Sequence, residues 1–213
     1  MDMRSAIAKI QRHGILLVFP ISNRPEPRSL WSEYFPRKKM RWEWDDSGDN
    51  HVGELWSLMK RLSDCKKVVY SKWYQGRATF FSRDLFRAML CIAQHRGAQD
   101  RLSQRSALTL LELLEQDSPL STKELKKQSG LQGRLNEPEY ARAMKELFGK
   151  LLIVAYGEVD DGAFPSLAVG ATKLLFEDLW LEAQDLAPHD AQRVVEKHMP
   201  PGSITHKFFA AKA

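Results

Sequence analysis

The chain has 213 residues, a formal net charge of +5 and a hydrophobic content of 43%. This composition excludes a disordered chain, because it supplies enough apolar side chains for a buried core. The length fits one large domain or two small ones. The two cysteines form no CxxC or Cys/His cluster, which excludes a disulfide framework and a zinc site, and we expect no metal and no cofactor.

The first residues have no signal-peptide pattern, and the apolar run at 14–21 is too short to span a bilayer. We therefore expect a cytoplasmic protein without membrane association. Basic residues dominate residues 4–41 and 60–105, whereas acidic residues dominate 157–190. One end is suited to approach phosphate, and the other is suited to avoid it or to contact a basic partner.

Hydrophobic spacing in the first half predicts helices, a buried strand and a hairpin. In chain order these are a helix (1–13), a strand (15–21), two helices (30–35 and 52–62) and a hairpin (67–82). Gly14 fits the position after the first helix, and Gln75-Gly76 fits the hairpin turn. Ser82 is suited to cap a further helix that reaches Gly97.

The second half predicts a helix (103–116), a short helix (122–129), a helix (137–150) and two strands (152–156 and 166–169). Ser121 and Glu124 have capping-box spacing at the start of the short helix. This order is typical of a winged helix-turn-helix, in which the third helix enters a DNA groove and the hairpin reaches the adjacent backbone.

The predicted fold class is therefore α+β and mostly helical. It has a winged helix-turn-helix in the C-terminal half and a helix-plus-hairpin N-terminal half that could be a second winged-helix-like unit. The expected division is a basic domain (1–101), the winged helix-turn-helix (102–173), two C-terminal helices packed on the core (174–199) and a mobile tail (200–213).

Three groups of residues, all cations except one tryptophan, are candidates for contact with double-stranded DNA. They are Arg142 and Lys145 on the third helix with Lys123 and Arg134 before it, Lys72, Trp73 and Arg77 at the hairpin tip, and Lys38 and Lys39 in a basic loop. Each has a plainer alternative: a solvated face with intrahelical ion pairs, a hairpin whose Trp73 packs in the core, and a solvated loop. The acidic segment 158–161 would be repelled by phosphate.

The acidic stretch 45–50 does not match a calcium-binding loop, because Asn50 and Trp56 stand where a glycine and a glutamate are required. Asp45 and Asp46 remain weak catalytic candidates. The sequence contains no Ser/His/Asp, HExxH or phosphate-cradling motif, so motifs give no support for an enzyme.

Three segments carry a resemblance to a known family. They are Arg41-Trp42-Glu43-Trp44-Asp45, the run from Val68 to Ser82, and Leu179-Trp180-Leu181-Glu182-Ala183. With the winged-helix pattern between them, they resemble the small AlkZ-related branch of the AlkZ/YcaQ DNA glycosylase superfamily over residues 30–186. The resemblance implies tandem winged-helix units and a role near DNA repair or regulation. The larger glycosylases carry a catalytic Gln-x-Gln motif, which this sequence lacks, so no catalytic residue is transferred.

Three functions follow as hypotheses. The first is a non-enzymatic DNA-binding protein in transcription regulation or DNA repair. The second is a reduced DNA glycosylase that acts on damaged bases. The third is a protein–protein module that uses its acidic wing and C-terminal helices. The sequence leaves the DNA sequence or lesion and the oligomeric state open.

Overall fold

A computed structural model describes residues 1–42, 50–159 and 165–212 of the chain. Asp45 and Asp46, and the acidic pair Asp160 and Asp161, lie outside the described residues. Among those that are described, every helix is too short or too polar to cross a lipid bilayer.

The chain folds into two units with the same order of elements. The elements of the first unit (residues 3–82) are α1 (Met3–His13), β1 (Ile15–Leu17), α2 (Leu30–Tyr34), α3 (His51–Ser63), β2 (Val68–Ser71) and β3 (Thr79–Ser82). Those of the second unit (residues 105–171) are α5 (Arg105–Gln116), β4 (Leu120–Ser121), α6 (Thr122–Gln128), α7 (Glu137–Gly149), β5 (Ile153–Val159) and β6 (Ser166–Ala171).

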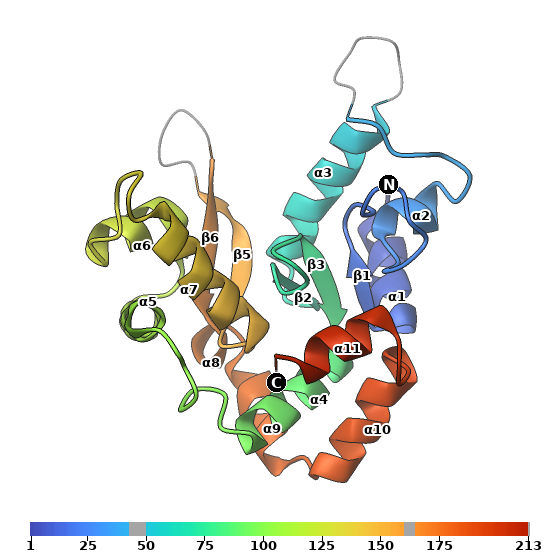
Figure 1. The fold of residues 1–213 in the computed structure, drawn as a ribbon. Helices are drawn as coiled ribbons and strands as arrows, with labels where there is room; N and C mark the ends of the chain where they lie inside the picture. The colour runs from blue at the N-terminus through green and yellow to red at the C-terminus, as the bar shows by residue number, and fades with distance from the viewer. Residues whose placement is uncertain (43–49, 160–164, 213) are drawn as a thin grey trace.

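The two sheets also share their topology. Each is antiparallel, with strand order β1-β3-β2 in the first unit and β4-β6-β5 in the second. In both units the last strand therefore lies between the other two. The chain thus uses one arrangement twice, and the units stand side by side as two lobes (Figure 1).

Helices outside the units join the lobes at their base (Figure 1). They are α4 (Arg83–His95), which connects the units, and α8 (Thr172–Leu175), α9 (Glu177–Asp185), α10 (Pro188–His198) and α11 (Ile204–Ala210), which follow the second. α4 packs against both α9 and α10. The α+β, mostly helical class predicted from the sequence is confirmed.

The first sheet is buried on both faces, which explains its continuous apolar strands. On one face Leu16 and Phe80 join the core shared with α1 and α3. On the other face Leu17, Val69 and Phe81 join a second core built with α4, α9, α10 and α11. The sheet is therefore the middle layer of the first half.

Three predicted elements differ from the observed ones. β1 ends at Leu17 rather than at residue 21, because Leu17 pairs with Thr79, the first residue of β3, and Pro20 has no N–H with which to extend the ladder. The helix predicted from Leu174 is divided into α8 and α9 at Phe176, which is buried and has non-helical angles (φ −130°, ψ 52°). The segment after Pro200, predicted as a mobile tail, contains α11, which begins with a Ser203 cap and buries Phe209.

Gly14 ends α1 with a φ of +76°, which is unfavourable for a residue with a side chain. Its carbonyl accepts a hydrogen bond from the Ser82 N–H at 2.7 Å, so it fixes the start of α4. A Cβ built on Gly14 would lie 2.4 Å from His198 Cγ, at the end of α10. Glycine is thus required here both by the backbone angle and by the close approach of α10.

We expect Gly14→Ala to destabilise the protein more than Gly76→Ala. Gly76 has nearly the same φ, +74°, but no atom lies within 4 Å of its added Cβ. A positive φ is unfavourable for alanine at both sites, but Gly14, with a ψ of −43°, lies outside the left-handed helical region, and only Gly14→Ala adds the clash with His198. Chemical denaturation measures the difference.

The double variant Gly14→Ala/His198→Ala is the control, because it removes the two closest contacts, with His198 Cγ and Nδ1, and keeps the backbone strain and the 2.7 Å contact with the Cβ of residue 198. It should recover part of the lost stability. Equal losses in Gly14→Ala and Gly76→Ala would contradict the close packing of α10 on Gly14.

Candidate nucleic-acid interface

The exposed face of α7 is more basic than its sequence suggests. Its inner face is formed by Tyr140, Ala143, Met144 and Leu147, which are all buried. Arg142 and Lys145, the cations that the sequence placed on this helix, are exposed.

Glu146, the residue after Lys145, is engaged within the chain. Its Oε1 accepts hydrogen bonds from the Ser103 N–H at 2.8 Å and the Ser103 hydroxyl at 2.9 Å, which ties α7 to the loop just before α5. Glu137 pairs with Lys126 at 2.7 Å. The acids that flank Arg142 and Lys145 are therefore largely committed to contacts within the chain, and Glu139 is the exposed acid beside them.

The segment between α6 and α7 adds further cations. Lys123 and Arg134 are both exposed. Lys123 lines a hollow of about 500 Å³ together with Gln132, Gly133 and Ser166, so the turn before α7 lies close to the start of β6. Leu135, next to Arg134, is 95% exposed. The second unit thus places cations along α7 and at the turn that precedes it.

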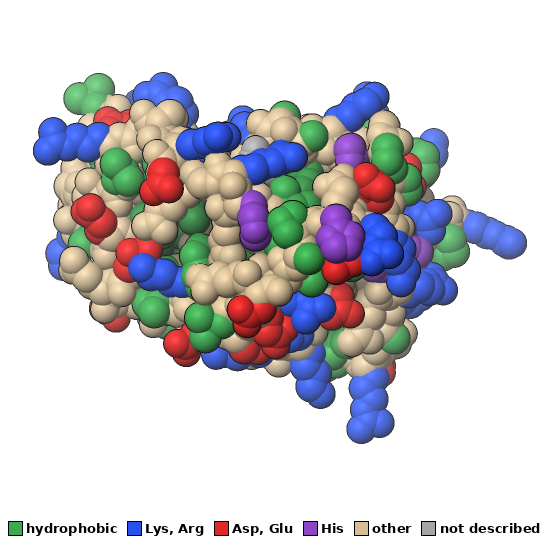
Figure 2. Space-filling view, turned by 90° about the horizontal axis from the view of Figure 1, so that it is seen from below, with side chains coloured by type: hydrophobic (Ala, Val, Ile, Leu, Met, Phe, Trp, Pro, Cys, Tyr) green, Lys and Arg blue, Asp and Glu red, His purple; other side chains and the backbone are tan. Residues whose placement is uncertain are grey.

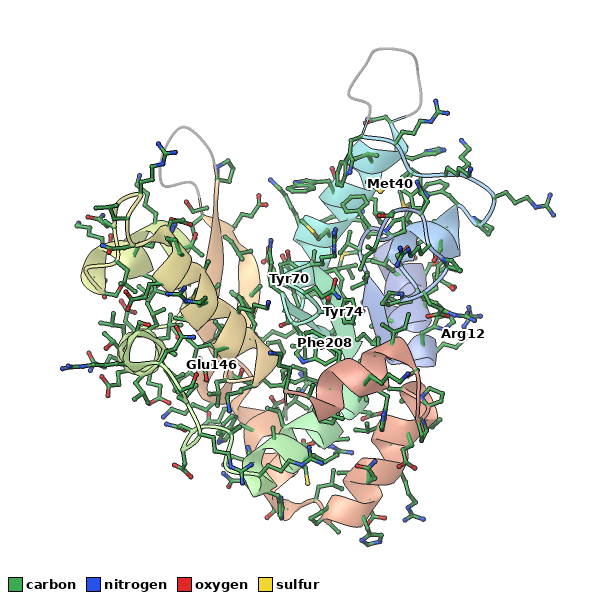
Figure 3. The ribbon with its side chains drawn as sticks, viewed as in Figure 1. Arg12, Met40, Tyr70, Tyr74, Glu146 and Phe208 are labelled. Carbon is green, nitrogen blue, oxygen red and sulfur yellow. The ribbon has the colours of Figure 1, made fainter. Side chains whose placement is uncertain are left out.

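The aromatic residues of the hairpin tip are not available for contact with a base, which corrects the prediction for Trp73. Trp73 and Tyr74 are only 2% and 3% exposed. Phe208 of α11 packs on both rings, at centroid distances of 4.9 Å and 4.8 Å. Tyr74 and Phe208 point toward each other (Figure 3). The apolar faces of the tip are used by the C-terminal helix.

The two cations of the tip differ in environment. Arg77 is exposed, next to the positive-φ turn residues Gln75 and Gly76. Lys72 is half-buried, and burial lowers the pKa of its ammonium group, while Glu158 acts in the opposite direction. Arg77 is therefore the cation of the tip that is best placed for a phosphate.

The basic loop after α2 is larger than the sequence indicated. Lys38 Nζ lies 2.9 Å from His51 Nε2, and Lys39 is exposed. Both line a hollow of about 480 Å³ into which the chain also brings Arg24 and Arg28. Sequence reasoning missed these two arginines, because the turn at residues 20–28 folds them back beside the loop.

The acidic strand β5 packs against the first unit. Glu158 pairs with Lys60 of α3 at 2.7 Å. Lys66 lies over the ring of Tyr156 at 5.7 Å from its centroid. The sequence suggested that the acidic segment contacts a basic partner. At Glu158 that partner is the first unit of the same chain. One consequence is that β5 covers part of α3.

The acidic helix α9 has a similar role. Asp178 pairs with Arg83, and Glu182 pairs with Arg87 at 2.9 Å, both on α4. These acids, which were candidates for a protein-partner surface, stabilise the base of the molecule. Cys65 and Cys91 are free thiols, and the described residues hold no cluster of three potential metal-ligating side chains.

Comparison with known proteins identifies the family of the chain. No curated protein and no solved structure gives a match. The family model described as AlkZ related matches residues 1–204, a range that includes both units and the helices from α4 to α10. Because the match covers most of the chain, the protein belongs to the AlkZ-related family.

Proposed function

We propose that the protein binds double-stranded DNA through two winged helix-turn-helix units, in a role in DNA repair or transcription regulation. The observation that carries this proposal is the repeat itself. Each unit has a 13-residue third helix, α3 or α7, followed by a hairpin, which is the order in which a winged helix presents one helix to a groove. Membership in the AlkZ-related family supports DNA as the partner.

Under this proposal the two units contribute differently. α7 keeps Arg142 and Lys145 on an exposed face, so it is the better candidate for the major groove. α3 is partly covered by β5, and its Lys60 is paired with Glu158. The first unit would therefore contact the DNA backbone through Arg77 and the basic loop that contains Lys39.

We expect Arg142→Ala/Lys145→Ala to lower the affinity for duplex DNA at least tenfold without changing thermal stability. Both side chains are exposed, and surface substitutions usually change stability by less than about 0.5 kcal/mol. If each cation neutralises one phosphate, the slope of log affinity against log salt should also fall by about 2. Fluorescence anisotropy over a salt series measures both effects.

The matched control is Arg193→Ala/Lys207→Ala, which removes two exposed cations from α10 and α11. It should leave the affinity and the salt slope close to those of the unmodified protein. Equal losses in the two double variants would mean that binding depends on net charge alone, and α7 would lose its assigned role.

The hairpin tip gives a separate prediction. Arg77→Ala should weaken DNA binding and leave stability unchanged, since the side chain is exposed. Trp73→Ala should lower the free energy of unfolding by about 3–5 kcal/mol, because Trp73 is buried beneath Phe208. Thermal unfolding and anisotropy of the two variants separate the roles. Weaker binding by a Trp73→Ala protein of unchanged stability would restore Trp73 as a DNA contact.

The family membership also favours a second candidate, a reduced DNA glycosylase. Base removal requires a positioned water and groups that stabilise the departing base. The sequence has no Gln-x-Gln motif and only Asp45 and Asp46 as weak candidates. We therefore expect no excision from alkylated or crosslinked duplexes. Abasic product that accumulates over several turnovers, and disappears in Asp45→Asn or Asp46→Asn, would assign the enzymatic function instead.

A further inference from the structure

Three helix ends meet at a hollow of about 540 Å³ in the first half of the molecule. They are the end of α1, the end of α10 and the start of α4, which contribute Arg12, Lys197 and Arg83. Lys67, from the loop before β2, also lines this hollow. Figure 2 shows lysine and arginine side chains on both halves of the face seen from below, with the histidine side chains from its centre to its right.

The hollow has a clear excess of positive charge. Four cationic side chains line it, Arg12, Lys67, Arg83 and Lys197, and Asp84 is the one carboxylate among the lining residues that are described. Arg12 is engaged with Glu33 at 2.9 Å, and Arg83 with Asp178. For Lys67 and Lys197 the described part of the chain provides neither an ion pair nor a side-chain hydrogen bond. Both lysines are exposed, and Asp84, the one carboxylate of the hollow, is outnumbered by these two unpaired ammonium groups.

Favourable interaction with helix dipoles explains only part of this arrangement. Cations in the last turn of a helix are stabilised by its negative end, which accounts for Arg12 on α1 and Lys197 on α10. It does not account for Lys67, which lies in a loop. Nor does it account for Arg83, which stands at the positive end of α4, where a further cation is unfavourable.

Neutral donors border the same hollow. Ser82 caps α4, and its Oγ accepts a hydrogen bond from the Leu85 N–H at 3.3 Å, so its own hydroxyl proton can still be donated. Gln11 offers an amide N–H₂ group. Backbone N–H groups at a helix start, serine hydroxyls and lysine ammonium groups together are the donors that bind phosphate oxygens.

An adjoining hollow of about 680 Å³ extends the site. It shares Arg12, Lys197 and His198 with the basic hollow, and its other lining residues include Ile15, Leu17, Pro27 and Ile204. A ligand whose phosphate lies in the basic hollow could therefore place an organic group against this apolar wall.

We propose that this basic hollow is a phosphate-binding site, held by Lys67, Lys197 and the start of α4. The phosphate belongs either to the backbone of a nucleic acid or to a free phosphorylated compound. The proposal is independent of the DNA contacts assigned to α7, because none of their residues lines the hollow.

The test uses inorganic phosphate as the probe and the full chain as the protein. Isothermal titration should show binding of phosphate, with chloride at the same ionic strength as the blank. Lys67→Ala and Lys197→Ala should each weaken it roughly tenfold, because each removes one charged hydrogen-bond donor. Lys67→Arg/Lys197→Arg should retain binding. Arg193→Ala/Lys207→Ala is the matched control and should bind phosphate as the unmodified protein does, because neither residue lines the hollow.

A DNA titration of Lys67→Ala/Lys197→Ala identifies the source of the phosphate. A loss of affinity beyond that of the Arg193→Ala/Lys207→Ala control would assign the site to the nucleic-acid backbone. Unchanged DNA affinity, with phosphate binding lost, would assign it to a free phosphorylated compound. The proposal is overturned if the unmodified protein does not bind phosphate. It is also overturned if Lys67→Ala and Lys197→Ala both bind phosphate as well as the unmodified protein does, with unchanged circular dichroism and melting temperature.

Discussion

Both faces of the first sheet must be covered, and this requirement organises the rest of the molecule. Leu16 and Phe80 face α1 and α3, whereas Leu17 and Phe81 face the layer of α4 and the C-terminal helices. A free-standing first unit would leave that second face open to water. The helices that follow the second unit therefore return to the first, which explains why segments far apart in sequence share one core.

Charge pairing reinforces this closure and changes the meaning of the acidic segments. Glu158 pairs with Lys60, Asp178 with Arg83 and Glu182 with Arg87. In each case an acid from the later part of the chain meets a cation from the earlier part. These exposed or half-exposed pairs are individually weak, but they neutralise acids that would otherwise repel phosphate. At these three pairs the opposite charges of the two ends are used in contacts within one chain.

Local patterns predicted the elements well, and long-range packing could not be predicted from them. The range of α7 followed from helical spacing, and the Gly14 turn followed from its place after α1. Trp73 was misassigned because Phe208, which covers it, is distant in sequence and no local pattern links the two. The same reason hid the hollow of Lys67 and Lys197, whose lining comes from three helix ends and a loop.

The repeat of the fold does not produce two equivalent surfaces. In the second unit the outer face of α7 keeps Arg142 and Lys145 exposed, while Glu146 is held by Ser103. In the first unit the corresponding helix, α3, lies against β5, and its Lys60 is already paired. A duplex held by both units would therefore be read by α7 and positioned by the cations of the first unit. Because backbone contacts fix orientation and base contacts fix sequence, such a division would place sequence recognition in the second unit and affinity in the first.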